Sequence, residues 1–291
     1  MAHEKHDHGT VHYKDSGIPQ PYHLVRPSIW PLVGAMVAGI MMLGLVLYMH
    51  KDKFTIGSMT IAAGLTLPLL GLAGLLFVMF AWWRDILHEA VVEKAHSPAA
   101  RRGLHYGMAL FISSEVMFFV AFFWAYYNSA LFPSAAIGGI WPPANITTSA
   151  TFDIPWFMTL ILLLSGTTVT WAHHAVLENR QKQAVRALIL TVALGISFTI
   201  CQAYEYLHTD FSLQSGIFGS TFFMATGFHG LHVIIGTIFL AVCLGRAKRG
   251  DFKPDSHFGL TAAAWYWHFV DVVWLFLFAS VYWYGASAVT H

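Results

Sequence analysis

Residues 216–253 read GIFGSTFFMATGFHGLHVIIGTIFLAVCLGRAKRGDFK, a largely apolar run over 216–244 that ends in a group of cations. About 20 mostly apolar residues in helical form are enough to cross the hydrocarbon core of a bilayer. Backbone N–H and C=O groups in lipid must be satisfied within the segment, so the run predicts a helix rather than an open strand. The cations that follow it mark a boundary with water.

Six further runs have the same character. Together the predicted spans cover residues 30–49, 57–81, 104–131, 155–177, 184–207, 216–244 and 259–284. Apolar residues make up 56% of the 291-residue chain and charged residues 11%, well below the usual share of about a quarter in soluble domains. The chain is therefore predicted to be an all-α integral membrane protein with seven transmembrane helices.

The sixteen Lys and Arg residues alternate with the spans. Fourteen of them lie in the N-terminal tail and in every second loop after it, whereas the intervening loops hold only Lys51 and Lys53. Cytoplasmic loops of membrane proteins carry the cations. This pattern predicts the N-terminus inside and the C-terminus outside. The net charge is close to neutral at +1, which argues against nucleic acid as a partner.

The chain is expected to have three parts: a polar His-rich tail over 1–29, a two-helix unit over 30–103 and a five-helix bundle over 104–291. A long inner loop over 82–103 separates the two helical parts, which predicts a cleft between them. Pro68 lies inside the second run and is expected to bend it. The loop 132–154 contains several Gly and Pro residues and is expected to be an ordered, turn-rich cap.

Ionisable residues inside the spans are the candidates for chemistry: Glu115, His229, His232, His268 and Asp271. A charge at the bilayer centre costs about 3 kcal/mol on insertion scales, so Glu115 must face the bundle and be paired or protonated. His229 and His232 share one helical face, and His268 and Asp271 are spaced to form a pair. Three interpretations remain open at this point: metal or haem ligation, proton relay, and hydrogen bonding between helices.

The tail contains five histidines, His3, His6, His8, His12 and His23. A disordered polar tail, adventitious metal binding and a surface that collects protons are all compatible with this composition. The two cysteines, Cys201 and Cys243, lie in different spans and are expected to pack as small apolar residues rather than to bind metal.

Over about residues 22–284 the sequence resembles cytochrome c oxidase subunit III of the haem–copper oxidases. The strings that carry the resemblance are RPSIWP (26–31), WWRD (82–85), SEVMFF (114–119), LLLSG (162–166), WAHH (171–174), QAYEY (202–206), MATGFHGLHVIIGT (224–237) and AAAWYWHFVDVVW (262–274). The strings from the sixth and seventh spans are long and specific.

The resemblance implies a core subunit without a catalytic residue, metal site or redox centre of its own. In the family, the haems and the oxygen-reducing copper are in subunit I, and the copper that receives electrons from cytochrome c is in subunit II. Subunit III forms a V of two and five helices that holds phospholipids, scaffolds subunit I and sustains proton uptake and turnover. The implied partners are subunits I and II, membrane phospholipids and, through subunit II, cytochrome c. This favours the structural interpretation of the membrane histidines.

The resemblance also implies lipid-binding positions. Four of them match the family, namely Trp83, Glu89, His96 and Arg246, and a cation at the inner end of a helix suits a phosphate head group. His88 stands where some members have arginine, and Thr261 stands where many have glutamate. The first change implies a weaker, pH-dependent contact with phosphate.

Two rival functions remain. A quinol oxidase subunit shares the five-helix core, but members of that branch often lack the first two spans. An independent proton-coupled transporter would use Glu115 and the histidines of the sixth span, but no inverted repeat is visible. The expected location is a bacterial plasma membrane because of the His-rich tail, with the mitochondrial inner membrane as the alternative.

The tail histidines are predicted to matter only where proton supply limits the rate. Histidine titrates near neutral pH and can exchange protons with bulk water. Deleting residues 1–20 should slow proton uptake by the oxidase more at high pH than at low pH, as measured with a pH-sensitive dye in vesicles. An equal effect at every pH, or none, would reduce the tail to an extension without a role in proton supply.

Overall fold

The computed structural model describes residues 11–12, 19–20, 27–50, 53–56, 59–62, 64–93, 96–144, 146, 148 and 150–285. Within these ranges, seven helices are long and apolar enough to cross a membrane, which confirms the predicted all-α membrane fold. The chain divides into two compact units, Met1–Gly103 and Leu104–His291, and each is described by itself.

The first unit is built on two helices, α1 (Trp30–His50) and α2 (Thr66–Val91). Between them in sequence, β3 (Lys53–Ile56) and β4 (Met59–Ala62) pair antiparallel. The helices pack closely at Gly71 of α2, where an added Cβ would lie 2.5 Å from the Met41 Cα of α1. A second short pair, β1 (Val11–His12) and β2 (Pro19–Gln20), precedes α1.

The prediction of a second span over 57–81 was wrong at both ends. Residues 59–62 form a strand, and the helix begins at Thr66 and continues to Val91. Thr and Ile in 53–62 favour strands. The helical turns of α2 after Trp83 are polar. A helix of 26 residues, at about 1.5 Å per residue, is longer than the roughly 30 Å thickness of the bilayer core. These polar turns can therefore lie outside the core.

Two further expectations about this unit were also wrong. Pro68 lies in the first turn of α2, where its missing N–H breaks no helical hydrogen bond, so it is not a site of bending. The connection expected over 82–103 is much shorter, because α2 ends at Val91 and α3 begins at Pro98.

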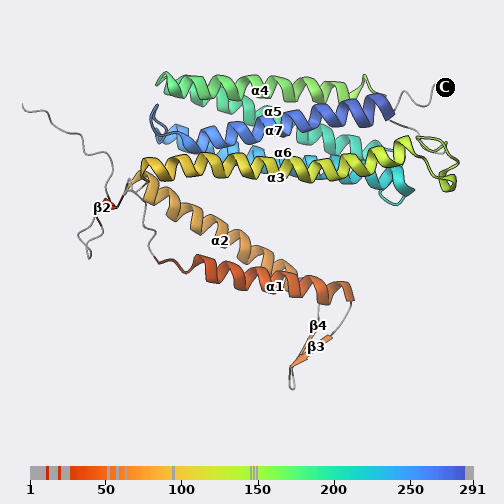
Figure 1. The fold of residues 1–291 in the computed structure, drawn as a ribbon, viewed down its shortest axis with the longest axis horizontal. Coiled ribbons are helices and arrows are strands. Elements are labelled where there is room, and N and C mark those ends of the chain that lie inside the picture. The colour runs from red at the N-terminus through yellow and green to blue at the C-terminus, as the bar shows by residue number, and fades with distance from the viewer. Residues whose placement is uncertain are drawn as a thin grey trace, which may run out of the picture. The chain divides into compact units, whose positions relative to one another are not determined.

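The second unit contains a bundle of long helices that lie side by side (Figure 1). They are α3 (Pro98–Leu131), α4 (Ile154–Leu177), α5 (Gln181–His208), α6 (Gly216–Arg249) and α7 (Phe258–Leu277). A π-helical segment, η2 (Phe278–Tyr284), continues α7. The loop after α3 holds a short 3₁₀ turn, η1 (Ala135–Ile137), and two glycines with positive φ, as expected for a turn-rich cap.

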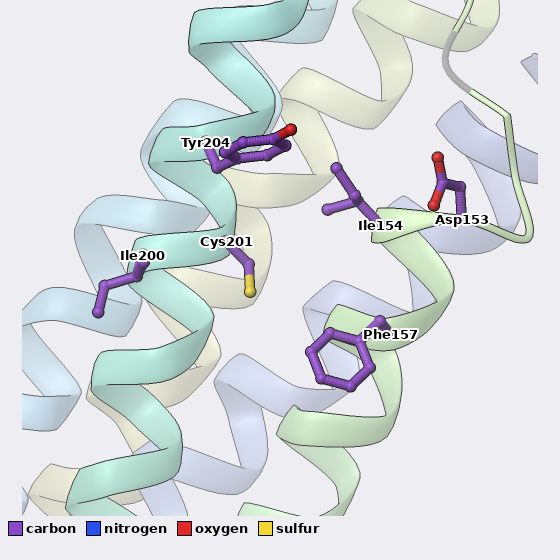
Figure 2. Close-up of a pocket in the computed structure, with 6 residues that line it drawn as sticks. All are labelled: Asp153, Ile154, Phe157, Ile200, Cys201 and Tyr204. Atoms are coloured by element: carbon purple, nitrogen blue, oxygen red, sulfur yellow. The ribbon is translucent and has the colours of Figure 1, made fainter.

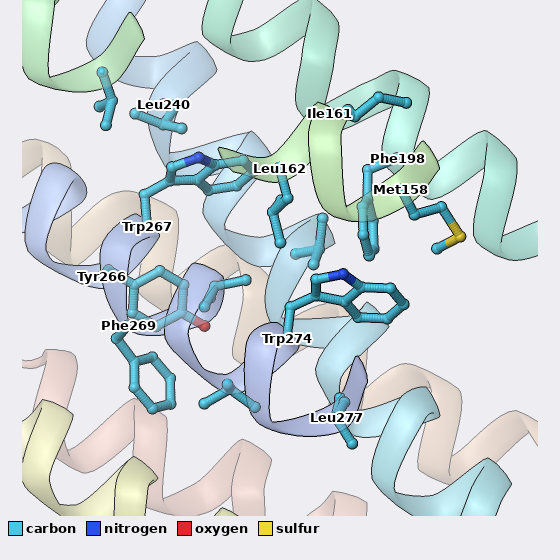
Figure 3. Close-up of a cluster of buried hydrophobic side chains, with 14 of the residues drawn as sticks. Met158, Ile161, Leu162, Phe198, Leu240, Tyr266, Trp267, Phe269, Trp274 and Leu277 are labelled. Carbon is cyan, nitrogen blue, oxygen red and sulfur yellow. The ribbon is translucent and has the colours of Figure 1, made fainter. Parts of the chain in front are cut away.

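The core of this bundle gathers around α7. Trp267 and Trp274 are fully buried and lie among Leu162 of α4, Phe198 of α5 and other apolar side chains (Figure 3). The indole N–H of Trp267 donates to Ser165 Oγ at 2.8 Å, and that of Trp274 donates to Thr159 Oγ1 at 2.9 Å. Each tryptophan thus combines a large apolar surface with a satisfied polar group, which a buried indole requires.

Gly71 is predicted to set the distance between α1 and α2. In Gly71→Val, the new side chain would overlap the backbone of Met41, and overpacking of this kind typically costs about 1–3 kcal/mol. The variant should unfold at a lower temperature than the wild type, as followed by tryptophan fluorescence. Gly39→Ala on α1 is the control, because a Cβ there meets nothing within 4 Å. Equal unfolding temperatures for the two variants would contradict the close packing at Gly71.

Candidate functional site

The structure joins Glu115 of α3 to His232 of α6. Glu115 Oε2 lies 3.0 Å from His232 Nε2. The other ring nitrogen, Nδ1, donates its proton to the Phe228 carbonyl at 2.7 Å. The rings of Phe118 and Phe119 pack beside the imidazole. The predicted need for a partner at Glu115 is therefore met by a histidine.

This geometry limits how protons can be shared. Because His232 Nδ1 must donate to a carbonyl, Nε2 of a neutral ring is an acceptor, and Glu115 Oε2 must then carry a proton. The alternative is a doubly protonated imidazole facing a carboxylate. Both arrangements place one proton between Oε2 and Nε2 and leave the pair without net charge, which the apolar surroundings favour.

The second pair connects α7 to α4. His268 Nδ1 lies 3.5 Å from Asp271 Oδ2, and His268 Nε2 lies 3.1 Å from Thr170 Oγ1. Asp271 fits against α4 because Gly166 has no side chain, since a Cβ there would lie 2.5 Å from Asp271 Oδ2. The predicted pairing of His268 with Asp271 is confirmed. His268 differs from the expected burial, because 45% of its side chain is exposed at the surface of the bundle.

His229 faces a different helix from His232. Its ring is fully buried beside Phe198 and Trp274, and Nε2 lies 3.2 Å from the Val270 carbonyl of α7, to which it donates. The two histidines of α6 therefore point their Nε2 atoms at different partners rather than at one ion. Across the part of the chain that the structure describes, no three His, Cys, Asp or Glu side chains are grouped so that they could hold a metal.

Glu205, in the last turn of α5, is a buried carboxyl group. Its side chain is 4% exposed. Glu205 Oε2 accepts hydrogen bonds from Gln202 Nε2 and from the Tyr282 hydroxyl, both at 3.0 Å. The signal available in the sequence was a glutamate in the last turn of an apolar helix. The partner Tyr282 belongs to the π-helical segment 77 residues away, which no local pattern indicates.

Thr261, which stands where the resemblance implies a glutamate in many members, faces a histidine. Its Oγ1 lies 3.2 Å from His173 Nε2, and the His173 ring lies 5.4 Å from that of His257, measured between centroids. Threonine thus supplies a neutral hydrogen-bond partner at the position where a glutamate would place a charge beside two imidazoles.

The predicted lipid-binding residues fall in both units. In the first, Trp83 is 61% exposed on α2, and His88 Nδ1 lies 3.5 Å from Glu93 Oε1. Glu89, also on α2, is partly buried, and so is His96, which lies just before α3.

In the second unit, Arg246 near the end of α6 is largely enclosed. Its Nε lies 3.8 Å from Asp251 Oδ2, and its guanidinium carbon lies 4.6 Å from the centre of the Phe252 ring. Neither partner was predicted from the sequence. The side chains of the tail histidines His3, His6, His8, His12 and His23 lie outside the described residues.

The sequence is similar to known proteins over most of its length. The family described as "Cytochrome c oxidase subunit III" matches residues 20–286. Cytochrome c oxidase subunit 3 of Danio rerio is 52% identical over 265 residues, which cover 91% of this chain and 97% of the relative. The subunits of the same name from Gadus morhua and Oncorhynchus mykiss are 52% and 51% identical with the same coverage.

Infrared spectroscopy can locate the proton of the Glu115–His232 pair. We expect the arrangement in which the carboxyl group and the imidazole are both uncharged, because apolar surroundings disfavour charged groups more than neutral ones. The spectrum of the wild type minus that of Glu115→Gln should then contain the C=O band of a protonated carboxyl at neutral pH. Gln keeps a donor that can face His232 Nε2, so the variant should keep its fold. A difference spectrum with carboxylate bands alone would show that the pair is an ion pair instead.

Proposed function

Because the chain belongs to the cytochrome c oxidase subunit III family, we propose that it is a non-catalytic core subunit that scaffolds the oxygen-reducing subunit and sustains proton uptake and turnover. The oxidoreductase activity belongs to the complex. The haems and copper would be held by subunits I and II, and cytochrome c would deliver electrons through subunit II. The relatives named above are cytochrome c oxidase subunits, which supports this donor over quinol.

One observation carries the proposal: ionisable side chains of the predicted spans form hydrogen bonds between helices. Glu115 meets His232, His229 meets the α7 backbone, and Glu205 meets Tyr282. Hydrogen bonds between transmembrane helices are worth roughly 0.6–2 kcal/mol each, so these contacts stabilise the packing of the bundle. A transporter that used Glu115 and the α6 histidines as a proton site would have to break them during each cycle.

The distribution of Lys and Arg residues supports an orientation with the N-terminus inside. The loop between α4 and α5 carries Arg180 and Lys182, and the last turns of α6 carry Arg246, Lys248 and Arg249. Successive helices bring these segments to one end of the bundle (Figure 1), which would face the cytoplasm or the matrix. The vertebrate relatives favour the mitochondrial inner membrane, whereas the expectation of a bacterial plasma membrane rests on the His-rich tail alone.

Phospholipid binding is proposed at Arg246, on the cation-rich side of the bundle, and separately at Trp83, His88, Glu89 and His96 on the two-helix unit. Asp251 lies beside Arg246 Nε, and a guanidinium has further N–H donors that suit phosphate oxygens. The exposed Trp83 ring offers an apolar surface to acyl chains. Glu89 would meet an amine head group, and His88 would meet phosphate in its protonated form.

Arg246→Ala tests the lipid role. The variant should retain less phospholipid after detergent washing, measured by mass spectrometry, and should lose activity sooner during continuous oxygen consumption. Its first turnovers should be normal, because the metal sites would be in subunits I and II. Arg249→Ala is the control, since Arg249 also contacts Asp251 but its side chain is 68% exposed.

Unchanged lipid content in Arg246→Ala would contradict the anchor. An immediate loss of activity would instead place Arg246 in the assembly of the complex.

A further inference from the structure

A groove opens between the start of α4 and the end of α5, away from the pairs described above. Its volume is about 350 Å³, and its lining is mostly apolar. The residues that line it are Asp153, Ile154, Phe157, Ile200, Cys201 and Tyr204 (Figure 2). The first three come from α4 and the residue before it, and the others come from α5.

Polarity changes along the groove. Asp153 immediately precedes α4, and Tyr204 lies in the last turns of α5, so both lie where the helices end. Phe157 and Cys201 lie about one turn further into the helices, and the Cys201 sulfur points into the space between the two helices (Figure 2). A polar mouth above an apolar floor matches the change from head group to acyl chain at the edge of a bilayer.

The Asp153 carboxylate is not used by the fold. Asp153 occupies the N-cap position of α4, yet its side chain makes no capping hydrogen bond. Among the described residues, no side chain pairs with it. Across the mouth, the Tyr204 ring stacks on His208 with 4.0 Å between the ring centres, and His208 Nδ1 donates to the Tyr204 carbonyl at 2.8 Å. The two walls of the mouth are therefore a carboxylate available to a ligand and a fixed aromatic ring.

The charge at this end of the bundle selects the ligand. Residues 132–153 and 209–216 contain Asp153 and Asp210 but no Lys or Arg. A phosphate or a fatty acid would find no fixed cation here, whereas an ammonium group would find a carboxylate. A primary ammonium can donate charge-assisted hydrogen bonds to carboxylate oxygens, which a quaternary choline group cannot.

We propose that this groove binds one phosphatidylethanolamine molecule. Its ammonium donates to the Asp153 carboxylate, and an acyl chain lies between Phe157 and Cys201. The site is distinct from the lipid position proposed at Arg246, because it lies at the opposite end of the bundle and its charged group is a carboxylate rather than a guanidinium.

The test uses the purified oxidase complex, stripped of lipid in detergent and reloaded with phosphatidylethanolamine, phosphatidylcholine or phosphatidylglycerol. After one washing protocol, bound lipid is counted by native mass spectrometry. Wild type should retain one more phosphatidylethanolamine per complex than Asp153→Asn, with no such difference for the other two lipids. Asp210→Asn is the matched control and should behave as wild type, because Asp210 does not line the groove.

Cys201→Phe provides a second test that leaves Asp153 intact. The larger ring fills the floor of the groove, so this variant should also lose one phosphatidylethanolamine. Equal retention of phosphatidylethanolamine by wild type and either variant overturns the proposal, as does an equal loss of phosphatidylglycerol. If Asp153→Asn fails to assemble, retention by Cys201→Phe alone decides the result.

Discussion

The packing of α4, α5, α6 and α7 depends on the buried indole of Trp267. Its N–H donates to Ser165 of α4. Its ring lies so close to α5 and α6 that a Cβ at Gly195 or Gly236 would come within 2.9 and 2.8 Å of it. One fully buried side chain of α7 thus touches three other helices, and two of these contacts require glycine. In lipid there is little hydrophobic drive between helices, so close packing of this kind and hydrogen bonds must hold them together.

The position of α7 in turn places the polar groups. With Trp267 and Trp274 both bonded to hydroxyls of α4, the next residues of α7 face α4 as well, and His268 and Asp271 meet Thr170 and the space left by Gly166. On the other side of the same turn, the Val270 carbonyl accepts a hydrogen bond from His229. The positions of these polar side chains are therefore set by the packing of α7, and their hydrogen bonds stabilise it.

Much of this was readable from the sequence, because each piece is local. A run of about 20 apolar residues specifies a span without knowledge of the rest of the chain, and six of the seven predicted spans lie within their helices or end close to them. The spacing of His268 and Asp271 likewise indicated a pair. The helix boundaries were harder to predict. The helix α2 continues through charged residues to Val91, so the chain stays helical after its hydropathy has fallen.

The pairing of Glu115 with His232 could not be predicted from the sequence for a different reason. The partners are 117 residues apart, and hydropathy says that Glu115 needs a partner but not which one. The same holds for Glu205 with Tyr282, which are 77 residues apart. Each depends on how two helices rotate against each other, which is decided by side-chain packing such as that around Trp267.

The most direct test of the central claim, that this chain supports the oxidase without carrying out its chemistry, is to compare the complex with and without it. Haem absorbance, copper and iron content, and oxygen consumption would be measured on both preparations. We predict the same metal content and nearly the same initial rate, with faster loss of activity during turnover when the chain is absent. Loss of a metal ion, or an initial rate that falls at once to a small fraction, would contradict the claim.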